Sequence, residues 1–205
     1  MGRKECSKVF EKKHIDKVKP LMDEYASIMS KIFNEAYSGE DKIFYTTNIV
    51  GEYAELLVCE KLKLKKEIAS NPEYDATDSK GRRYQIKSRW MNDLGSGAGK
   101  DEFGAFKPNC DDGPIHYLVL VVFNGDTFND VHIYSMNIER DFKKILSLQN
   151  SNQLKPKIFG NERIDGSYKC YYRNSFKKLI ELGLIQEELW WNSFFVTLTA
   201  FWILR

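Results

Sequence analysis

The spacing of hydrophobic residues changes several times along the chain, and each change marks an expected element. Apolar residues recur every three to four positions from about 17 to 37 and again over 48–62, which predicts two amphipathic helices, the second capped by Asn48. The run of Tyr, Leu and Val at 116–123 predicts a strand buried on both faces, with 131–136 as its antiparallel neighbour. The full set of expected elements is helices at 17–37, 48–62, 138–148 and 175–188, and strands at 74–78, 82–89, 116–123, 131–136 and 168–172.

This order of elements predicts an α/β fold with a central mixed β-sheet flanked by helices. Residues 91–114 contain five glycines among Asn, Asp and Pro without a sustained period, which predicts a long loop. We expect four segments: an N-terminal helical segment at 1–46, a core at 47–148, a C-terminal loop and helix packed on the core at 149–188, and a hydrophobic tail at 189–205.

Composition narrows the class of protein. With 205 residues, 42% of them hydrophobic, the chain can bury one ordinary core, and its net charge of +2 means that any basic binding face must be local. The four cysteines, Cys6, Cys59, Cys110 and Cys170, form no CxxC pair, and the charged N-terminus does not have the pattern of a signal peptide. We therefore expect a reducing, cytoplasmic compartment.

The C-terminal tail is unusually apolar. Leu189 to Leu204 is a stretch of sixteen residues without a formal charge. A helix of that length spans about 24 Å, short of the roughly 30 Å hydrocarbon core of a membrane. A tail anchor, a buried or dimer-forming helix, and a loosely integrated extension all fit this pattern, and we expect burial or an oligomer contact in preference to membrane attachment.

The most informative chemistry lies in the hairpin predicted over residues 74–89. Side chains two apart on a strand share a face, so Gln85 and Lys87 should point one way while Ile86 points the other. The turn between the strands brings Asp75 toward Gln85 and Lys87. An aspartate can hold a hard divalent cation, and a lysine can steady a phosphate or a metal-bound water. This arrangement suits phosphodiester hydrolysis.

The preceding helix offers further carboxylates. Glu52 and Glu55 lie three positions apart, so either can approach the hairpin. Glu52 is the first choice because it follows Gly51, which permits close approach, and Glu55 is the second. Asp78 is a weaker candidate, because it should lie on the strand face opposite Asp75.

Three segments together resemble the PD-(D/E)xK, or restriction-endonuclease-like, nuclease superfamily. They are Gly51-Glu52-Tyr53-Ala54-Glu55, Tyr74-Asp75-Ala76 and Gln85-Ile86-Lys87. More narrowly, the chain over about 47–136 is similar to small bacterial restriction-endonuclease-like domains of unassigned function. In that superfamily the signature aspartate and the acidic residue two positions before the lysine bind magnesium. The lysine positions or activates the attacking water, and a helix glutamate often completes the site.

The resemblance implies a role for each matching residue. Asp75 is the metal-binding aspartate, Lys87 is the catalytic lysine, and the backbone carbonyl of Ile86 with Glu52 or Glu55 completes the set of Mg²⁺ ligands, with Mn²⁺ as a substitute. Gln85 departs from the pattern, because its amide oxygen can coordinate magnesium but brings no negative charge. The implied function is a magnesium-dependent DNA endonuclease in restriction or defence. The alternative is a catalytically degenerate nuclease-like module that binds nucleic acid or another protein.

Basic and aromatic residues near the hairpin are candidates for DNA contact. Arginine and lysine neutralise phosphates and aromatic rings stack on unpaired bases, although a solvated charged hairpin explains the same pattern. Cleavage of both strands of a duplex would favour a homodimer. The candidate nucleic-acid-binding residues are Arg82, Arg83, Arg89, Trp90, Lys100 and Lys107.

Overall fold

The structure is a computed structural model that describes residues 12–38, 42–67, 73–91, 102–111, 113–125, 128–172 and 174–189. The chain divides into two compact units, 1–45 and 46–205. In the first unit, helix α1 (Lys12–Ile32) continues into the π-helical turn η1 (Phe33–Tyr37); the three-to-four spacing predicted this helix and its end but placed its start near 17. Residues 43 and 44 return to this turn, where the backbone N–H groups of Ile43 and Phe44 both donate to the carbonyl of Ala36.

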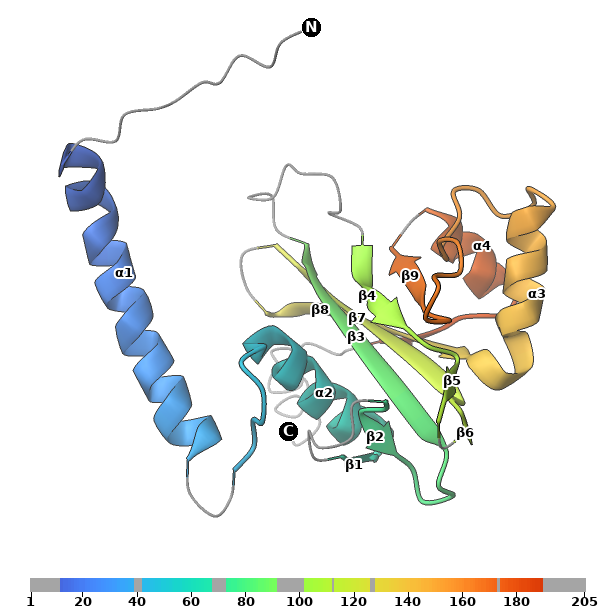
Figure 1. Cartoon of the computed structure of the whole chain (residues 1–205), viewed down its shortest axis with the longest axis horizontal. Coiled ribbons are helices and arrows are strands. Elements are labelled where there is room, and N and C mark those ends of the chain that lie inside the picture. Colours follow the sequence, from blue (N-terminus) through green and yellow to red (C-terminus); the bar gives the residue numbers. More distant parts are fainter. Residues whose placement is uncertain are drawn as a thin grey trace, which may run out of the picture. The chain divides into compact units, whose positions relative to one another are not determined.

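The second unit is built on a mixed β-sheet. Within the described residues this sheet has six strands in the order β1-β2-β3-β7-β8-β10 (Figure 1). Strands β3 and β7 are parallel and the other neighbours are antiparallel, which confirms the predicted α/β class with a central mixed sheet. The strands are β1 (Lys65–Lys66), β2 (Ala76–Thr77), β3 (Arg83–Met91), β7 (Tyr117–Asn124), β8 (Asp130–Asn137) and β10 (Gln186–Leu189).

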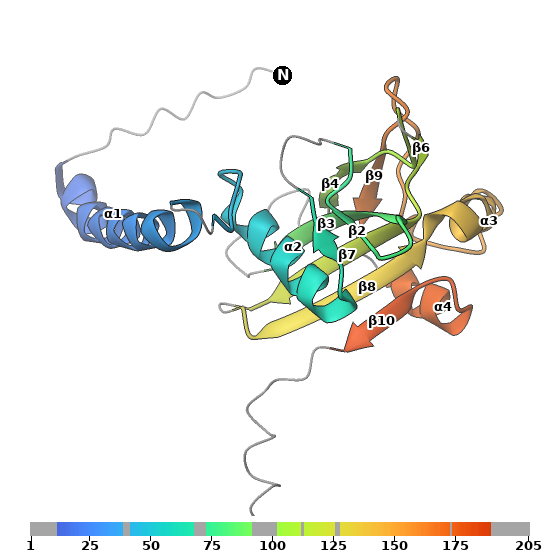
Figure 2. The same cartoon turned by 90° about the horizontal axis from the view of Figure 1, so that it is seen from below.

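Helices cover both faces of this sheet (Figures 1 and 2). Helix α2 (Ile49–Leu62) begins at the expected cap, where Asn48 Oδ1 accepts from the N–H of Gly51 at 3.2 Å, and it packs on one face. On the other face lie α3 (Ile138–Asn150) and α4 (Ser175–Glu181). Strand β7 is buried on both faces because its alternate residues belong to two different hydrophobic clusters.

The predicted loop at 91–114 is partly wrong. Its described residues contain β4 (Glu102–Phe106), β5 (Asn109–Cys110) and β6 (Gly113–Pro114), and β4 pairs with β9 (Tyr168–Tyr171). Phe103 and Phe106 are each 1% exposed within the core. No period is visible here because the strands are short and Gly104 interrupts the first of them.

Two other predicted boundaries are corrected. The strand expected at 74–78 is limited to Ala76–Thr77, although the backbone of Asp75 still donates to the carbonyl of Tyr84 and accepts from the N–H of Glu67. The helix expected at 175–188 ends at Glu181, since Gly183 adopts a φ of +66° and ends the helical turn. The chain then continues as β10, whose partner on the edge of the sheet is β8, an element distant in sequence.

Among the helices in the described ranges, none is both long and apolar enough to cross a membrane. The predictions for Lys100 and for tail residues 190–205 concern positions outside the described residues and stay predictions.

Candidate active site

The hairpin between β2 and β3 is fixed by its turn. Asp78 Oδ1 accepts from the backbone N–H groups of Lys80 at 2.9 Å and Arg82 at 3.0 Å, and its Oδ2 pairs with the Arg82 guanidinium at 2.6 Å. Gly81 completes the turn at a φ of +74°. Asp78 therefore orders the turn, and the register it sets places Ala76 opposite Tyr84.

Asp75 lies where β2 and β3 separate. Its N–H donates to the carbonyl of Tyr84 at 2.9 Å, and its Oδ2 accepts from the N–H of Ile86 at 2.6 Å. The carboxylate thus replaces a backbone carbonyl in the ladder. Because the N–H and C=O of one strand residue point to the same side, the carbonyl of Ile86 also points to the side of β3 on which Asp75 lies.

The electrostatic setting of Asp75 favours a bound cation. Burial raises the pKa of Asp75 above its ordinary value of 3.8, and the charge of Lys87, the N–H of Ile86 and the charge of Lys66 act to lower it. Burial prevails, so the negative carboxylate is under-compensated by the protein itself. A divalent cation beside it would supply the missing positive charge.

The side chain of Gln85 contains a buried polar atom whose hydrogen bonding is incomplete among the described residues. The side chain is 7% exposed, and its Nε2 donates to the carbonyl of Glu73 at 3.3 Å. Its Oε1 is buried and has no hydrogen-bond partner among the described residues. An unsatisfied buried acceptor costs about 1–3 kcal/mol, so such an atom calls for an explanation. Ala76 pairs with Tyr84, and Asp75 and Gln85 are the residues that adjoin this pair on the two strands.

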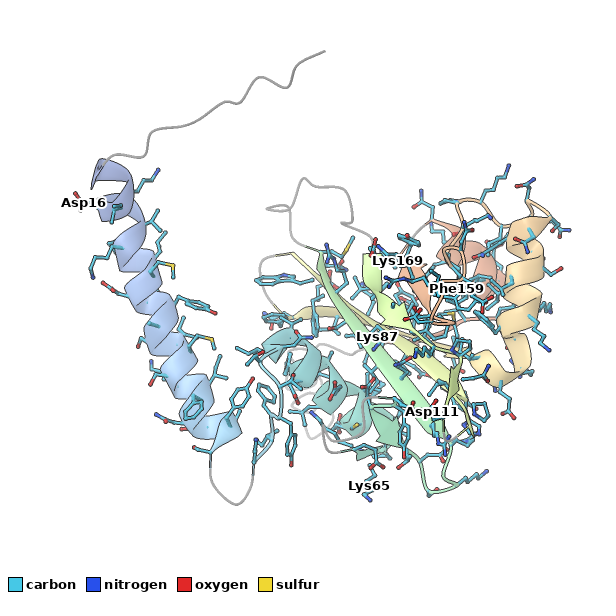
Figure 3. All side chains as sticks on the ribbon, in the orientation of Figure 1. Asp16, Lys65, Lys87, Asp111, Phe159 and Lys169 are labelled. Carbon is cyan, nitrogen blue, oxygen red and sulfur yellow. The ribbon has the colours of Figure 1, made fainter. Side chains whose placement is uncertain are left out.

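Lys87 follows Gln85 on the same strand and projects from the same face, as predicted. Figure 3 shows it midway along β3, close to β4. Its stem passes Gly104 of β4, where an added Cβ would lie 3.6 Å from Lys87 Cδ. The alternate residues Tyr84 and Ile86 belong to the hydrophobic cluster beneath α2, which confirms the predicted alternation.

The two glutamates of α2 share a partner that the sequence did not reveal. The ammonium group of Lys66 contacts Glu52 Oε2 and lies 2.9 Å from Glu55 Oε2. The second oxygen of Glu52 accepts from the N–H of Thr46 at 2.6 Å. Lys66 stands in a lysine-rich segment with Lys63 and Lys65, and no pattern there distinguishes it, so only the fold singles it out.

The predicted DNA-contacting residues that the structure describes lie at separate places on the fold. Arg82 is engaged by Asp78 and by the Tyr117 hydroxyl, at 2.9 Å from the latter. Arg83 lies over the ring of Tyr74 at 5.2 Å, near the same end of β3. At the other end, roughly 20 Å away along the strand, Trp90 Nε1 donates to the carbonyl of Gly125 at 2.7 Å. Arg89 neighbours Trp90, and Lys107 lines a separate cavity of about 530 Å³ beside α3.

The donor set is small but chemically suitable for a hard cation. Among the described residues, no group of three or more His, Cys, Asp or Glu side chains is arranged to hold a metal ion. The ligands that the resemblance implies are instead the Asp75 carboxylate, the Gln85 amide and the Ile86 carbonyl, whose oxygens are all of types that Mg²⁺ accepts. Waters complete the shell of a Mg²⁺ bound by so few protein groups.

Comparison with protein-family models gives no match, and no curated protein is significantly similar to this chain.

Proposed function

We propose that this chain is a magnesium-dependent endonuclease that hydrolyses phosphodiester bonds in DNA, with a site of the PD-(D/E)xK type. The observation that carries the proposal is the buried Oε1 of Gln85, which has no hydrogen-bond partner among the described residues and lies on the strand to which the buried carboxylate of Asp75 is hydrogen-bonded. Neither oxygen is well compensated by the protein, and a cation bound between them would satisfy both. Lys87 stands on the same face of β3, as the resemblance requires.

Each residue then has a defined task. Asp75, the amide oxygen of Gln85 and the carbonyl of Ile86 would hold Mg²⁺, or Mn²⁺ in its place. A cation bound there would supply Lewis-acid activation of the phosphate and of a water. Lys87 would position the attacking water and offset negative charge that develops on the phosphate. The basic residues at the two ends of β3 would contact the DNA backbone as separate sites.

The deciding experiment is incubation of the purified chain with plasmid and with single-stranded DNA, in Mg²⁺, in Mn²⁺ and in chelator. Asp75→Ala and Lys87→Ala should each abolish metal-dependent cleavage while circular dichroism stays that of the wild type. Asp130→Ala and Lys65→Ala are matched controls at exposed positions and should cleave normally. Cleavage at the wild-type rate by either site variant would contradict the proposal.

A second candidate function is a nuclease-like module that binds nucleic acid or a protein without cutting. It is favoured by one observation, the pairing of Glu52 and Glu55 with Lys66, which engages two of the three carboxylates expected as metal ligands. The variant Gln85→Glu separates the two functions. If the site is degenerate, the wild type should not cleave, and Gln85→Glu should bind the metal more tightly because of the restored charge. If the site works, the wild type with Gln85 in place should already cleave.

A further inference from the structure

Lys66 is placed by the fold to hold two carboxylates at once. It lies in β1 opposite Ala76, which is fully buried beneath α2, so its side chain is directed at that helix. The ammonium group contacts Glu52 and Glu55, three positions apart on one face of α2. The side chain of Lys66 is 14% exposed, and those of Glu52 and Glu55 are 2% and 22% exposed.

Buried carboxylates need a cation, and here the chain supplies it. Two charges taken out of water are tolerated only with close pairing and additional hydrogen bonds. Burial lowers the pKa of Lys66, and its hydrogen bonds to Glu52 and Glu55 outweigh that effect, so the pKa is raised overall. Lys66 therefore stays protonated at neutral pH, between the two glutamates.

This cation belongs to the electrostatic environment of the proposed metal site. The charges of Lys66 and Glu52 both act on the carboxylate of Asp75. Three carboxylates and two ammonium groups, those of Lys66 and Lys87, thus share one neighbourhood, with a net charge of −1 from −3 and +2. Two-metal phosphodiester sites hold their ions about 3.5–4 Å apart with shared carboxylates, which would demand more negative charge than this.

We propose that Lys66 is a built-in cation that stands in for a second divalent ion between Glu52 and Glu55. The site is thereby limited to one divalent ion, at Asp75. The placement of that one ion rests on the proposed function, whereas the role of Lys66 does not. Glu52 and Glu55 then act as positioning residues that tie β1 to α2 and are not metal ligands.

The test counts Mn²⁺ bound per chain by electron paramagnetic resonance, using full-length protein. Lys66→Met removes the charge but keeps most of the side-chain volume, and it should bind one more Mn²⁺ than the wild type. The matched control is Lys63→Met, since Lys63 pairs with Glu60 at 3.2 Å on the surface, where the two side chains are 80% and 66% exposed. This control should bind the same number as the wild type.

The outcomes separate the two proposals. One ion in the wild type and two in Lys66→Met support both. None in the wild type and one in the variant supports the role of Lys66 and contradicts the proposed ion at Asp75. One ion in each contradicts the role of Lys66 alone, and none in either contradicts both.

Two further variants guard against a folding defect. Lys66→Met combined with Glu52→Gln keeps the local net charge and should bind no additional ion; an additional ion in this double variant would overturn the assignment of the new site to Glu52. If Lys66→Met does not fold even with Mn²⁺, Glu55→Gln in the wild-type background decides. An unchanged Mn²⁺ count in Glu55→Gln supports the pairing with Lys66, and loss of an ion makes Glu55 a ligand and overturns the proposal.

Discussion

The Oδ2 atom of Asp75 accepts a hydrogen bond of 2.6 Å from the backbone N–H of Ile86. This bond replaces a strand-to-strand bond with a side-chain bond at the point where β2 leaves β3. The carboxylate is thereby fixed to the strand that carries Gln85 and Lys87. The geometry of the proposed site depends on this junction, because the Ile86 carbonyl points to the same side of the strand as the N–H that Asp75 accepts from.

Asp75→Asn should separate the stability of the fold from metal binding. Because burial raises the pKa of Asp75 above 3.8, the folded state binds a proton more tightly than the unfolded state does. Wild-type stability should therefore fall as pH rises from 3.8 through that raised pKa, and Asp75→Asn should lack this loss. In chelator at pH 7, urea unfolding should show the variant to be as stable as the wild type or more stable, by up to about 1 kcal/mol.

Adding Mn²⁺ should reverse that order. At a free concentration of 100 times Kd, one bound ion stabilises the wild type by about 2.7 kcal/mol, and the variant should gain nothing. Equal stabilisation of the two proteins by Mn²⁺ would remove Asp75 from the set of ligands.

Gln85→Glu should bind Mn²⁺ at least about tenfold more tightly, because it adds a second carboxylate to an oxygen-ligand site. Without metal the new carboxylate would be buried beside Asp75, so the melting temperature in chelator should fall. Calorimetric titration and thermal scans with and without Mn²⁺ measure both effects. An unchanged affinity would mean that position 85 does not face the ion.

Lys87→Met should lose cleavage but keep Mn²⁺ binding. The affinity should rise by a few fold, since the variant removes a positive charge that acts on Asp75. Lys169→Met is the control, on the β4–β9 pair, where Lys169 pairs with Glu102 at 2.6 Å. This control variant should leave cleavage and Mn²⁺ binding unchanged. Loss of Mn²⁺ binding in Lys87→Met would instead indicate a structural role for the lysine.

Asp78→Ala should destabilise the fold without removing metal binding. It deletes two hydrogen bonds to turn N–H groups and the pair with Arg82, at a cost of about 1–3 kcal/mol in the free energy of unfolding. Burial acts to raise the pKa of Asp78, but hydrogen bonds from Arg82 and Lys80 lower it overall. The stabilisation should therefore be present above pH 3.8 and be lost as pH falls further, so the wild type and the variant should converge in acid.

Hydrophobic periodicity predicted an element most reliably where the pattern within that element alone shows which of its residues are buried. Strand β7 reads as a run of apolar residues because both of its faces are covered, and α2 and α3 begin at Asn48 and Asn137, whose side chains cap them locally. It failed at β4 and β10. Both are short strands whose partners, β9 and β8, lie far along the chain.

The sequence by itself determined the α/β class, the hairpin and the alternation that puts Gln85 and Lys87 on one face, because these depend on spacing within a single element. Only the tertiary structure decided the partners of the charged groups. The buried oxygen of Gln85, which lacks a partner among the residues that the structure describes, and the pairing of Lys66 with Glu52 arise where segments separated in sequence meet. Burial and charge compensation depend on such contacts, which no local pattern records.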